Sequence, residues 1–407
     1  MRAPRKLLFV LVGLLLLDVF VSGTLVDRDL FLDRPLPPFG ARTHPRQDEW
    51  LANLERPPEE RDGLGRFDAE LGWTWRPSAA SPDGRFHINA DGQRGTRSYA
   101  ARPGEDVLRI ACFGDSFVFG DEIPDRSTFP AILEARKPKW EVPNYGVSGY
   151  GTDQALLRFR RRAARPEGLG ARIVVLGFLF ENVGRNVNRY RPLWNPSTGF
   201  CATKPRFVLE GGPSAAVAAS AHGSGAGDTL RLLPQPYPDE RSLALAVRDG
   251  SVVDAIRDHE FWIDRPSVPR WSSLMRLVGW ARAQRARQVS RLYADPEREP
   301  VRVTLALLET FHREALASGA ERALILLLPS ERDLAHADGG TPFWSTLVDA
   351  LEARGVPCLD TSPALLRRRA ELQAEGREHA LYFGYHLSGE GNAVVAAELE
   401  RWVDRGP

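Results

Sequence analysis

IACFGDSFVFG, residues 110–120, is an apolar run that ends in Gly-Asp-Ser and becomes apolar again at once. Its first half continues LRIACF (108–113), which is apolar throughout, like a strand buried on both faces. If this strand belongs to a parallel sheet, the triplet lies at the edge where such sheets bind ligands. Gly114 then permits a tight turn, Asp115 caps backbone N–H groups, and Ser116 presents its hydroxyl. Alone, the triplet is more often a plain turn, so its meaning depends on the rest of the chain.

Apolar runs alternate with amphipathic segments through most of the sequence. Runs with the character of buried strands lie at 108–113, 171–180, 322–329 and 356–360. Between them lie helical patterns such as VTLALLETFHREALASGA (303–320), and GNAVVAAELERWV (391–403) follows the last run. This alternation is typical of parallel strands covered by helices on both faces. The sequence therefore predicts an α/β fold, a three-layer α/β/α sandwich with a parallel sheet.

The N-terminus has the pattern of an export signal. A basic start, MRAPRK, precedes LLFVLVGLLLLDVFVSGTLV (7–26), which is long enough to cross a bilayer. Asp18 interrupts this run, and a carboxylate in hydrocarbon is costly unless it is paired. Val21-Ser22-Gly23 is a tolerable cleavage site, but we favour an uncleaved anchor. We expect the remainder to lie outside the cytoplasm, and to be secreted if the signal is cleaved.

The other boundaries follow from changes in composition. Residues 1–26 are expected to be the signal anchor or signal peptide, and the Pro-rich, charged residues 27–65 an extended linker. A small β-rich lead-in module is expected at 66–106, followed by the main domain at 107–407. An insertion at about 187–300, with a flexible tip near 213–228, is expected above the sheet, where it would shape a substrate pocket.

The overall charge excludes some partners. Lys plus Arg number 54 and Asp plus Glu 53, so no global field favours nucleic acid. Two basic clusters, 158–167 and 281–293, are charged helix faces, either solvated or available to a phospholipid or another partner. The three cysteines cannot form a disulfide framework, and no Cys or His spacing is typical of zinc.

Three further stretches are expected at the same sheet edge as Ser116. Gly149 lies in NYGVSGYG (144–151) and offers an unobstructed backbone N–H. Asn182, after the strand ending in FLF, offers an amide donor, and His386 precedes the last helix. A nucleophile needs a base within reach and donors for the developing oxyanion. The serine hydroxyl, the histidine, the glycine N–H and the asparagine amide are groups that can supply the nucleophile, the base and the donors.

In this order, GDS, NYGVSGYG, FLFEN and YHLS resemble the sequence blocks of the SGNH hydrolase superfamily, the GDSL-type esterases and lipases. The resemblance runs from about 107 to 403. It implies a flavodoxin-like sandwich, Ser116 as nucleophile and His386 as general base. It also implies an oxyanion hole formed by the Ser116 backbone N–H with Gly149 and Asn182, and no cofactor.

Two positions depart from that pattern. Glu181 and Val183 replace the residues that usually surround the Asn, and Phe383 stands where the triad acid usually precedes the His by three residues. Three explanations remain open. A backbone carbonyl near Phe383 or Gly384 orients His386, a carboxylate such as Asp360 or Glu181 substitutes, or the protein is a degenerate relative that binds ligands without turnover.

The sequence thus predicts a membrane-anchored hydrolase that cleaves an ester through a Ser116 acyl-enzyme. Its substrate is expected to be a small-molecule or glycan ester, such as O-acetyl groups of an envelope polysaccharide, or a lipid ester. An O-acyltransferase that uses the same acyl-enzyme and a catalytically degenerate glycan-binding protein are the alternatives. Asn89 and Arg94 in INADGQRG (88–95) are expected to fix a loop near the site.

Overall fold

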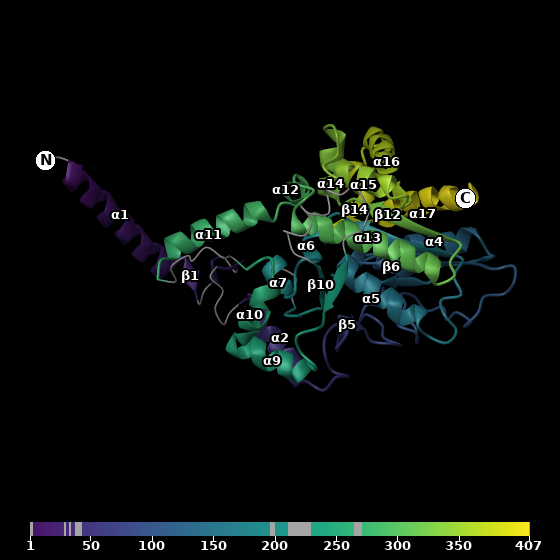
Figure 1. The fold of residues 1–407 in the computed structure, drawn as a ribbon, viewed down its shortest axis with the longest axis horizontal. Coiled ribbons are helices and arrows are strands. Elements are labelled where there is room, and N and C mark those ends of the chain that lie inside the picture. Colours follow the sequence, from purple (N-terminus) through teal and green to yellow (C-terminus); the bar gives the residue numbers. More distant parts are fainter. Residues whose placement is uncertain are drawn as a thin grey trace. The chain divides into compact units, whose positions relative to one another are not determined.

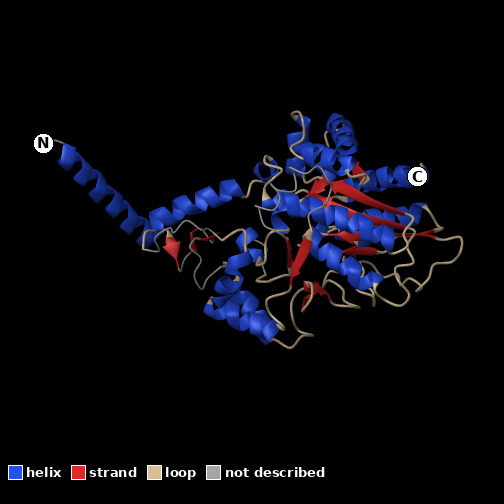
Figure 2. Ribbon diagram, viewed as in Figure 1, coloured by secondary structure: helices blue, strands red, loops and turns tan. Residues whose placement is uncertain are grey.

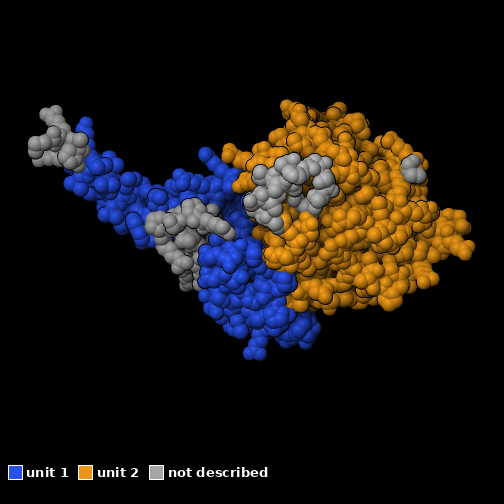
Figure 3. All heavy atoms as spheres, viewed as in Figure 1, with its two compact units in different colours: residues 1–62, 187–204, 234–288 blue, residues 63–186, 205–233, 289–407 orange. Residues whose placement is uncertain are grey.

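The computed structural model of the chain describes residues 3–27, 30–31, 34–36, 43–195, 200–210, 229–263 and 271–406. These residues form two compact units (Figure 3). The first comprises 1–62, 187–204 and 234–288, and the second comprises 63–186, 205–233 and 289–407. The tip predicted near 213–228 lies outside the described residues.

The second unit is built on a six-stranded sheet in which every pair of neighbouring strands is parallel. The strands are β6 (Leu108–Gly114), β7 (Trp140–Glu141), β8 (Asn144–Gly146), β9 (Ile173–Leu179), β12 (Arg322–Leu328) and β13 (Cys358–Asp360). Their order is β13-β12-β9-β6, with β7 and β8 pairing with successive parts of β6 at the edge. With β7 and β8 taken as one strand, this is the 2-1-3-4-5 order of flavodoxin-like sheets.

Helices cover both sides of this sheet (Figures 1 and 2). One core cluster joins alternate residues of the strands to the helices α4, α16 and α17, whereas Phe113 of β6 points to the other side and contacts Phe159 and Phe311. The helices involved are α4 (Phe129–Arg136), α5 (Thr152–Ala163), α13 (Glu299–Ala317), α16 (Ser362–Ala374) and α17 (Gly389–Asp404). The predicted three-layer α/β/α class with a parallel sheet is therefore confirmed.

Other elements of the second unit surround this sandwich. The antiparallel pairs are β4 with β5, β10 with β11, and β14 with β15. Their bounds are β4 (Gly65–Asp68), β5 (Gly72–Trp75), β10 (Arg206–Leu209), β11 (Leu230–Leu233), β14 (Tyr382–Phe383) and β15 (His386–Leu387). The shorter helices are α3 (Ser116–Phe119), α6 (Asn182–Arg185), α12 (Val289–Tyr293), α14 (Glu331–Asp338) and α15 (Ser345–Ala353).

The first unit begins with α1 (Ala3–Thr24), whose segment Lys6–Thr24 is long and apolar enough to cross a membrane. A small antiparallel sheet of β1, β2 and β3 follows. The remaining elements are β1 (Val26–Asp27), β2 (Leu30–Phe31), β3 (Arg34–Pro35), α2 (Gln47–Glu55), α7 (Arg191–Trp194), α9 (Glu240–Asp249), α10 (Ser251–Ile256) and α11 (Ser273–Ala286).

The domain boundaries predicted from composition stay a prediction, and the compact units divide the chain differently. The segment 27–65, expected as an extended linker, contains helix α2. The side-chain amide of Gln47 in this helix donates to the Val247 carbonyl 3.0 Å away, within the same unit. Residues of the predicted insertion are divided between both units. Pro-rich composition therefore did not exclude local packing.

Helix α3, which begins at Ser116, is held against β8 by a very close approach. A Cβ atom added at Gly146 would lie 2.3 Å from the backbone nitrogen of Phe119. The Asn144 side chain donates to the Val118 carbonyl 2.7 Å away, which fixes the same turn of α3 to the sheet edge. Only glycine at position 146 allows this contact.

We expect Gly146→Ala to lower the melting temperature, because overpacking against a backbone that cannot move aside costs about 1–3 kcal/mol. Gly65→Ala is the matched control, since a Cβ there meets only the Thr74 carbonyl oxygen at 3.9 Å. Thermal unfolding followed by circular dichroism is the measurement. An unchanged midpoint for Gly146→Ala, or an equal decrease for both variants, would contradict the close approach.

Candidate active site

Ser116 lies at the carboxyl end of β6, where the strand turns into α3. Gly114 has a φ of +154°, and a Cβ there would meet the Gly177 carbonyl oxygen of β9 at 2.8 Å. Asp115 caps α3 by accepting a hydrogen bond from the Phe117 backbone N–H at 2.8 Å. The neighbouring strand β9 ends just before Asn182, so Ser116 and Asn182 lie at the switch point of the sheet, where ligands bind in such folds.

Asp115 joins the two strand ends. Its carboxylate accepts a hydrogen bond from the Asn182 side-chain amide at 2.7 Å, and the Arg185 guanidinium lies 4.0 Å away. The carboxyl group is 1% exposed, and this burial raises its pKa, while Arg185 acts in the opposite direction. The buried carboxyl thus holds the turn at Ser116 and Asn182 together.

Asn182 keeps one donor available. One amide hydrogen is bound to Asp115, and within the described part of the chain the second has no acceptor and Oδ1 has no partner. Gly149 lies in the loop between β8 and α5, with a φ of +80°. Its neighbour Ser148 is fixed on both sides, because its carbonyl accepts from Trp73 and its hydroxyl donates to Asp121.

His386 lies on the short β14–β15 hairpin and packs beside the nucleophile helix. Its ring centroid is 5.2 Å from that of Phe117, the residue after Ser116, and Tyr385 packs against Phe117 as well. Within the residues that the structure describes, no hydrogen bond joins the imidazole to Ser116 Oγ. His386 and the helix that begins at Ser116 are therefore neighbours, without a hydrogen bond between the two side chains in the described residues. Such bonds are often long in unliganded sites.

Two carboxylates flank the imidazole. Glu122 Oε2 lies 3.3 Å from His386 Nδ1, and Asp121 Oδ2 lies 3.8 Å from Nε2. Neither Glu122 Oε2 nor His386 Nδ1 has a hydrogen-bond partner within the described ranges, although both atoms are buried. Burial raises the pKa of Asp121, against the effects of His386 and of the Ser148 hydroxyl that donates to it.

The backbone at Glu122 is unusual. Its φ is +71°, one of two positive values among the non-glycine residues that the structure describes. A Cβ on Gly384, the turn residue of the hairpin, would lie 2.8 Å from Glu122 Oε2. The left-handed conformation and the bare glycine together bring the carboxylate up to His386. Sequence reasoning missed Glu122 because nothing in the order of residues shows that the 120–125 turn folds back onto the hairpin.

The carboxylates that the sequence offered as replacements for the missing acid are engaged elsewhere. Asp360 accepts from the Trp344 indole at 3.0 Å and from the backbone N–H of Ser362, the first residue of α16, at 2.8 Å. Glu181 accepts from the Tyr385 hydroxyl at 2.6 Å and pairs with Arg185. His386 Nδ1 has no backbone acceptor in the described residues either, and Phe383 is 59% exposed.

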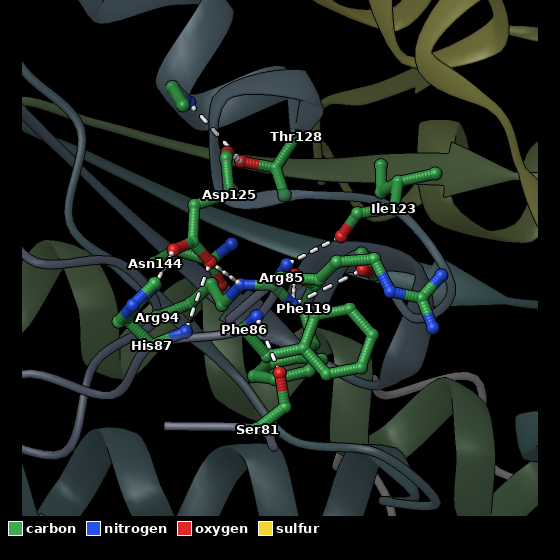
Figure 4. A network of polar contacts seen from close by, with 12 residues as sticks. Ser81, Arg85, Phe86, His87, Arg94, Phe119, Ile123, Asp125, Thr128 and Asn144 are labelled. Atoms are coloured by element: carbon green, nitrogen blue, oxygen red, sulfur yellow. Dashed lines mark hydrogen bonds and ion pairs between the residues drawn. The ribbon is translucent and has the colours of Figure 1, made fainter. Parts of the chain in front are cut away.

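Arg94 fixes the 119–125 turn, which contains Asp121 and Glu122. Figure 4 shows Arg94 beside Phe119, Ile123 and Asp125. Its guanidinium pairs with Asp125 and donates to the carbonyls of Phe119, Gly120 and Ile123. It also lies over the ring of Phe119, with its central carbon 4.3 Å from the centroid. The side chain is 1% exposed, so these contacts are shielded from water. Arg94 therefore fixes a loop beside the candidate site, as the sequence predicted. Asn89 braces the INADGQRG turn itself by donating to Gln93 and the Arg97 carbonyl.

Comparisons with known proteins find similarity only at the level of solved structures. No family model and no curated protein matches the chain. A lipolytic protein of the G-D-S-L family from Veillonella parvula is 12% identical, with a TM-score of 0.34, covering 74% of this chain and 100% of that chain. The acetyl xylan esterase AlAXEase is 11% identical, with a TM-score of 0.35, covering 73% and 100%.

A catalytic mutant of Axe2, an acetylxylan esterase from Geobacillus stearothermophilus, is 11% identical, with a TM-score of 0.33, covering 74% of this chain and 94% of that chain. These proteins are of the kind that the sequence blocks resemble. Likeness at such TM-scores does not establish an activity, so the assignment depends on the geometry of this site.

We expect Arg94→Met to destabilise the protein by about 3–5 kcal/mol, because Asp125 loses its buried cation, although it keeps its contact with His87, and three carbonyls lose their donor. Arg97→Met is the matched control. Arg97 is 49% exposed and pairs with Glu134 at the surface, where such a pair contributes about 0–1 kcal/mol. Urea unfolding and hydrogen exchange of 119–125 measure both effects. Equal, small changes in the two variants would refute the role of Arg94.

Proposed function

We propose that the second unit is a serine hydrolase that cleaves an ester through an acyl-enzyme on Ser116. The observation that carries the proposal is the meeting of three separate elements at one sheet edge. The nucleophile turn and Asn182 are tied by Asp115 at 2.7 Å, and the His386 ring packs 5.2 Å from that of Phe117. Nucleophile, base and oxyanion donor are the parts that acyl transfer needs.

In the proposed reaction, Ser116 Oγ attacks the ester carbonyl carbon while His386 accepts the hydroxyl proton. The tetrahedral intermediate collapses, the C–O bond to the alcohol breaks, and the imidazolium returns its proton to the leaving alcohol. Water then attacks the acyl-enzyme by the same route, which releases the carboxylic acid and restores Ser116. No cofactor enters this sequence.

The oxyanion is assigned to three donors. The N–H of Ser116 lies in the first turn of α3, where backbone donors have no partner within the helix. The second amide hydrogen of Asn182 and the N–H of Gly149 complete the set. Removing one such donor from a working oxyanion hole costs about 10²–10³ in rate.

Glu122 takes the part of the missing triad acid in this proposal. Its Oε2 and the His386 Nδ1 are two unsatisfied buried atoms 3.3 Å apart, so a small adjustment of either side chain satisfies both. A carboxylate at Nδ1 fixes the tautomer in which Nε2 accepts the serine proton and stabilises the imidazolium that forms. Phe383 is then no obstacle to turnover.

The proposed location of the second unit narrows the choice of substrate class. Helix α1 behind a basic N-terminus supports an anchored protein whose second unit lies outside the cytoplasm. Esters at that place include the O-acetyl groups of envelope polysaccharides and the esters of lipids, and we favour the former. Acyl transfer to a sugar hydroxyl is the second candidate, because Ser116 is only 3% exposed and an enclosed acyl-enzyme limits attack by water.

We expect a fluorophosphonate probe to label Ser116 in the full chain, and Ser116→Ala to abolish both labelling and esterase activity without lowering the melting temperature. Mass mapping of the adduct identifies the labelled residue, and His386→Ala should label far more slowly. If well-folded protein is not labelled, the glycan-binding alternative replaces the hydrolase. A labelled acyl donor offered with a glycan acceptor distinguishes free acid from transferred acyl group.

We expect Glu122→Gln to lower kcat by up to about 10⁴-fold, the loss that follows when a triad acid is neutralised. The second test is rescue by Phe383→Asp in the Glu122→Gln background. Residues 383 and 386 pair across the hairpin, so this substitution places a carboxylate opposite His386. The double variant should regain activity, and Phe383→Asp alone should change little. Full activity in Glu122→Gln, or no recovery in the double variant, would exclude Glu122 as the orienting group.

A further inference from the structure

Asp18 is the one acidic residue in the apolar segment of α1, and its side chain has specific partners. It is 8% exposed, whereas most of its neighbours in the helix are exposed, such as Leu17 at 46% and Val19 at 63%. Its Oδ1 accepts hydrogen bonds from the Ser272 hydroxyl at 3.0 Å and from the Leu274 backbone N–H at 2.6 Å. Ser22, one turn later, donates to the Ser273 hydroxyl at 2.8 Å.

These partners form the start of helix α11, which lies in the same compact unit as α1. Backbone donors at a helix start carry partial positive charge, so Asp18 acts as an additional acceptor at the N-terminus of α11. A carboxylate with such partners loses much of the penalty of lying in an apolar helix. Asp18 is therefore a docking contact for α11.

Helix α11 has two different faces. The inner face carries Arg276, which donates to the Leu36 carbonyl at 3.1 Å, and Trp280, whose ring contacts Phe31 at 6.3 Å. Roughly the opposite face carries an exposed stripe at helical spacing. We call it the α11 stripe, and it consists of Trp271 just before the helix, then Met275, Val278, Arg282 and Arg285.

The α11 stripe changes in character along its length. Trp271, Met275 and Val278 are 78%, 47% and 40% exposed, and they lie nearest to the contact with Asp18. Arg282 and Arg285 follow towards the far end of the helix. Exposed apolar groups beside a membrane segment can enter the boundary of the acyl chains, and cations near a bilayer surface attract anionic headgroups.

We propose that the α11 stripe inserts into the outer leaflet of the bilayer that α1 spans, so that α11 is a second, interfacial membrane contact. The inference rests on the membrane anchoring included in the proposed function. The single occupant is the phospholipid bilayer, with Trp271, Met275 and Val278 at the boundary of acyl chains and headgroups. Arg282 and Arg285 contact anionic headgroups.

The depth of Asp18 within the membrane segment supports the bilayer as the partner of the α11 stripe. Asp18 precedes Thr24, the last residue of the apolar segment, by six residues, which corresponds to about 9 Å along a helix. A helix whose start is bonded at that level enters the region, about 5–10 Å deep, in which interfacial helices bury their apolar face. Figure 1 shows α11 starting beside α1 and leading away from it.

The arrangement also bears on signal cleavage. Cleavage after Gly23 would remove Asp18 and Ser22 together, which are the groups that bond Ser272, Leu274 and Ser273. The start of α11 would lose these acceptors, and the apolar end of its stripe would lose the adjoining membrane segment. Retention of α1 is therefore part of the proposal.

The test uses the full chain reconstituted in phosphatidylethanolamine and phosphatidylglycerol vesicles. Single cysteines at Met275 and Val278 carry an environment-sensitive nitrobenzoxadiazole label, in a Cys358→Ser background because Cys112 and Cys201 are buried. Leu245 on α9, 52% exposed in the same unit but outside the α11 stripe, is the matched control for an exposed apolar position. Flotation of the vesicles reports anchoring independently of the label.

We expect blue-shifted emission at 275 and 278, quenching there by lipids that carry a nitroxide on the acyl chain, and neither effect at 245. Asp18→Leu should keep the chain bound to vesicles but reduce the shift at 275. Aqueous emission at 275 and 278 in floated protein would overturn the interfacial role alone. A blue shift without lipid quenching would also overturn it, since protein then covers the stripe. Failure to float would reject the anchor itself.

Discussion

The buried carboxylate of Asp115 is the interaction on which the candidate site depends. The two central strands, β6 and β9, end close to Asp115 and Asn182, respectively. Nothing in a parallel sheet by itself fixes the two loops that follow these strands to each other. Asp115 does so by accepting from Phe117 in one loop and from Asn182 in the other. A carboxylate with 1% exposure would be costly without these donors and Arg185. The same contacts that offset its burial also align Ser116 with Asn182, which we propose as nucleophile and oxyanion donor.

Close packing and a second buried charge support the contacts of Asp115 from further out. Glycine at 146 lets β8 approach α3, and Arg94 holds the turn that follows α3 through Asp125 and three carbonyls. That turn brings Glu122 to His386, although the two residues lie far apart in the sequence. Different elements therefore fix these two residues. The β14–β15 hairpin fixes His386, and the turn held by Arg94 fixes Glu122. The precision of the site is a property of the scaffold rather than of any one loop.

The sequence predicted the sandwich and the meeting of Ser116 and Asn182 at one sheet edge because both follow from local pattern. LRIACF and RALILLLP are apolar throughout, and only strands covered on both faces need that composition. Ser116 and Asn182 follow such strands directly, so topology brings them together. Glu122 and the packing of α2 were beyond that reasoning. Glu122 reaches His386 through a left-handed backbone angle and a glycine on the facing hairpin, and neither contact has a signature in residue spacing.

Two acidic residues of this chain break general rules, one of sequence pattern and one of backbone conformation. Each of them lies close to a distant segment of the chain. Asp18 is a carboxylate within an apolar helix, and Glu122 is a non-glycine residue with φ at +71°. Such exceptions persist only where the surrounding structure offsets their cost. For Asp18 the counterpart is the start of α11, and for Glu122 it is the imidazole of His386, 3.3 Å away beside a bare glycine. Each of these two exceptions therefore coincides with a long-range contact, and both contacts lie where we place function.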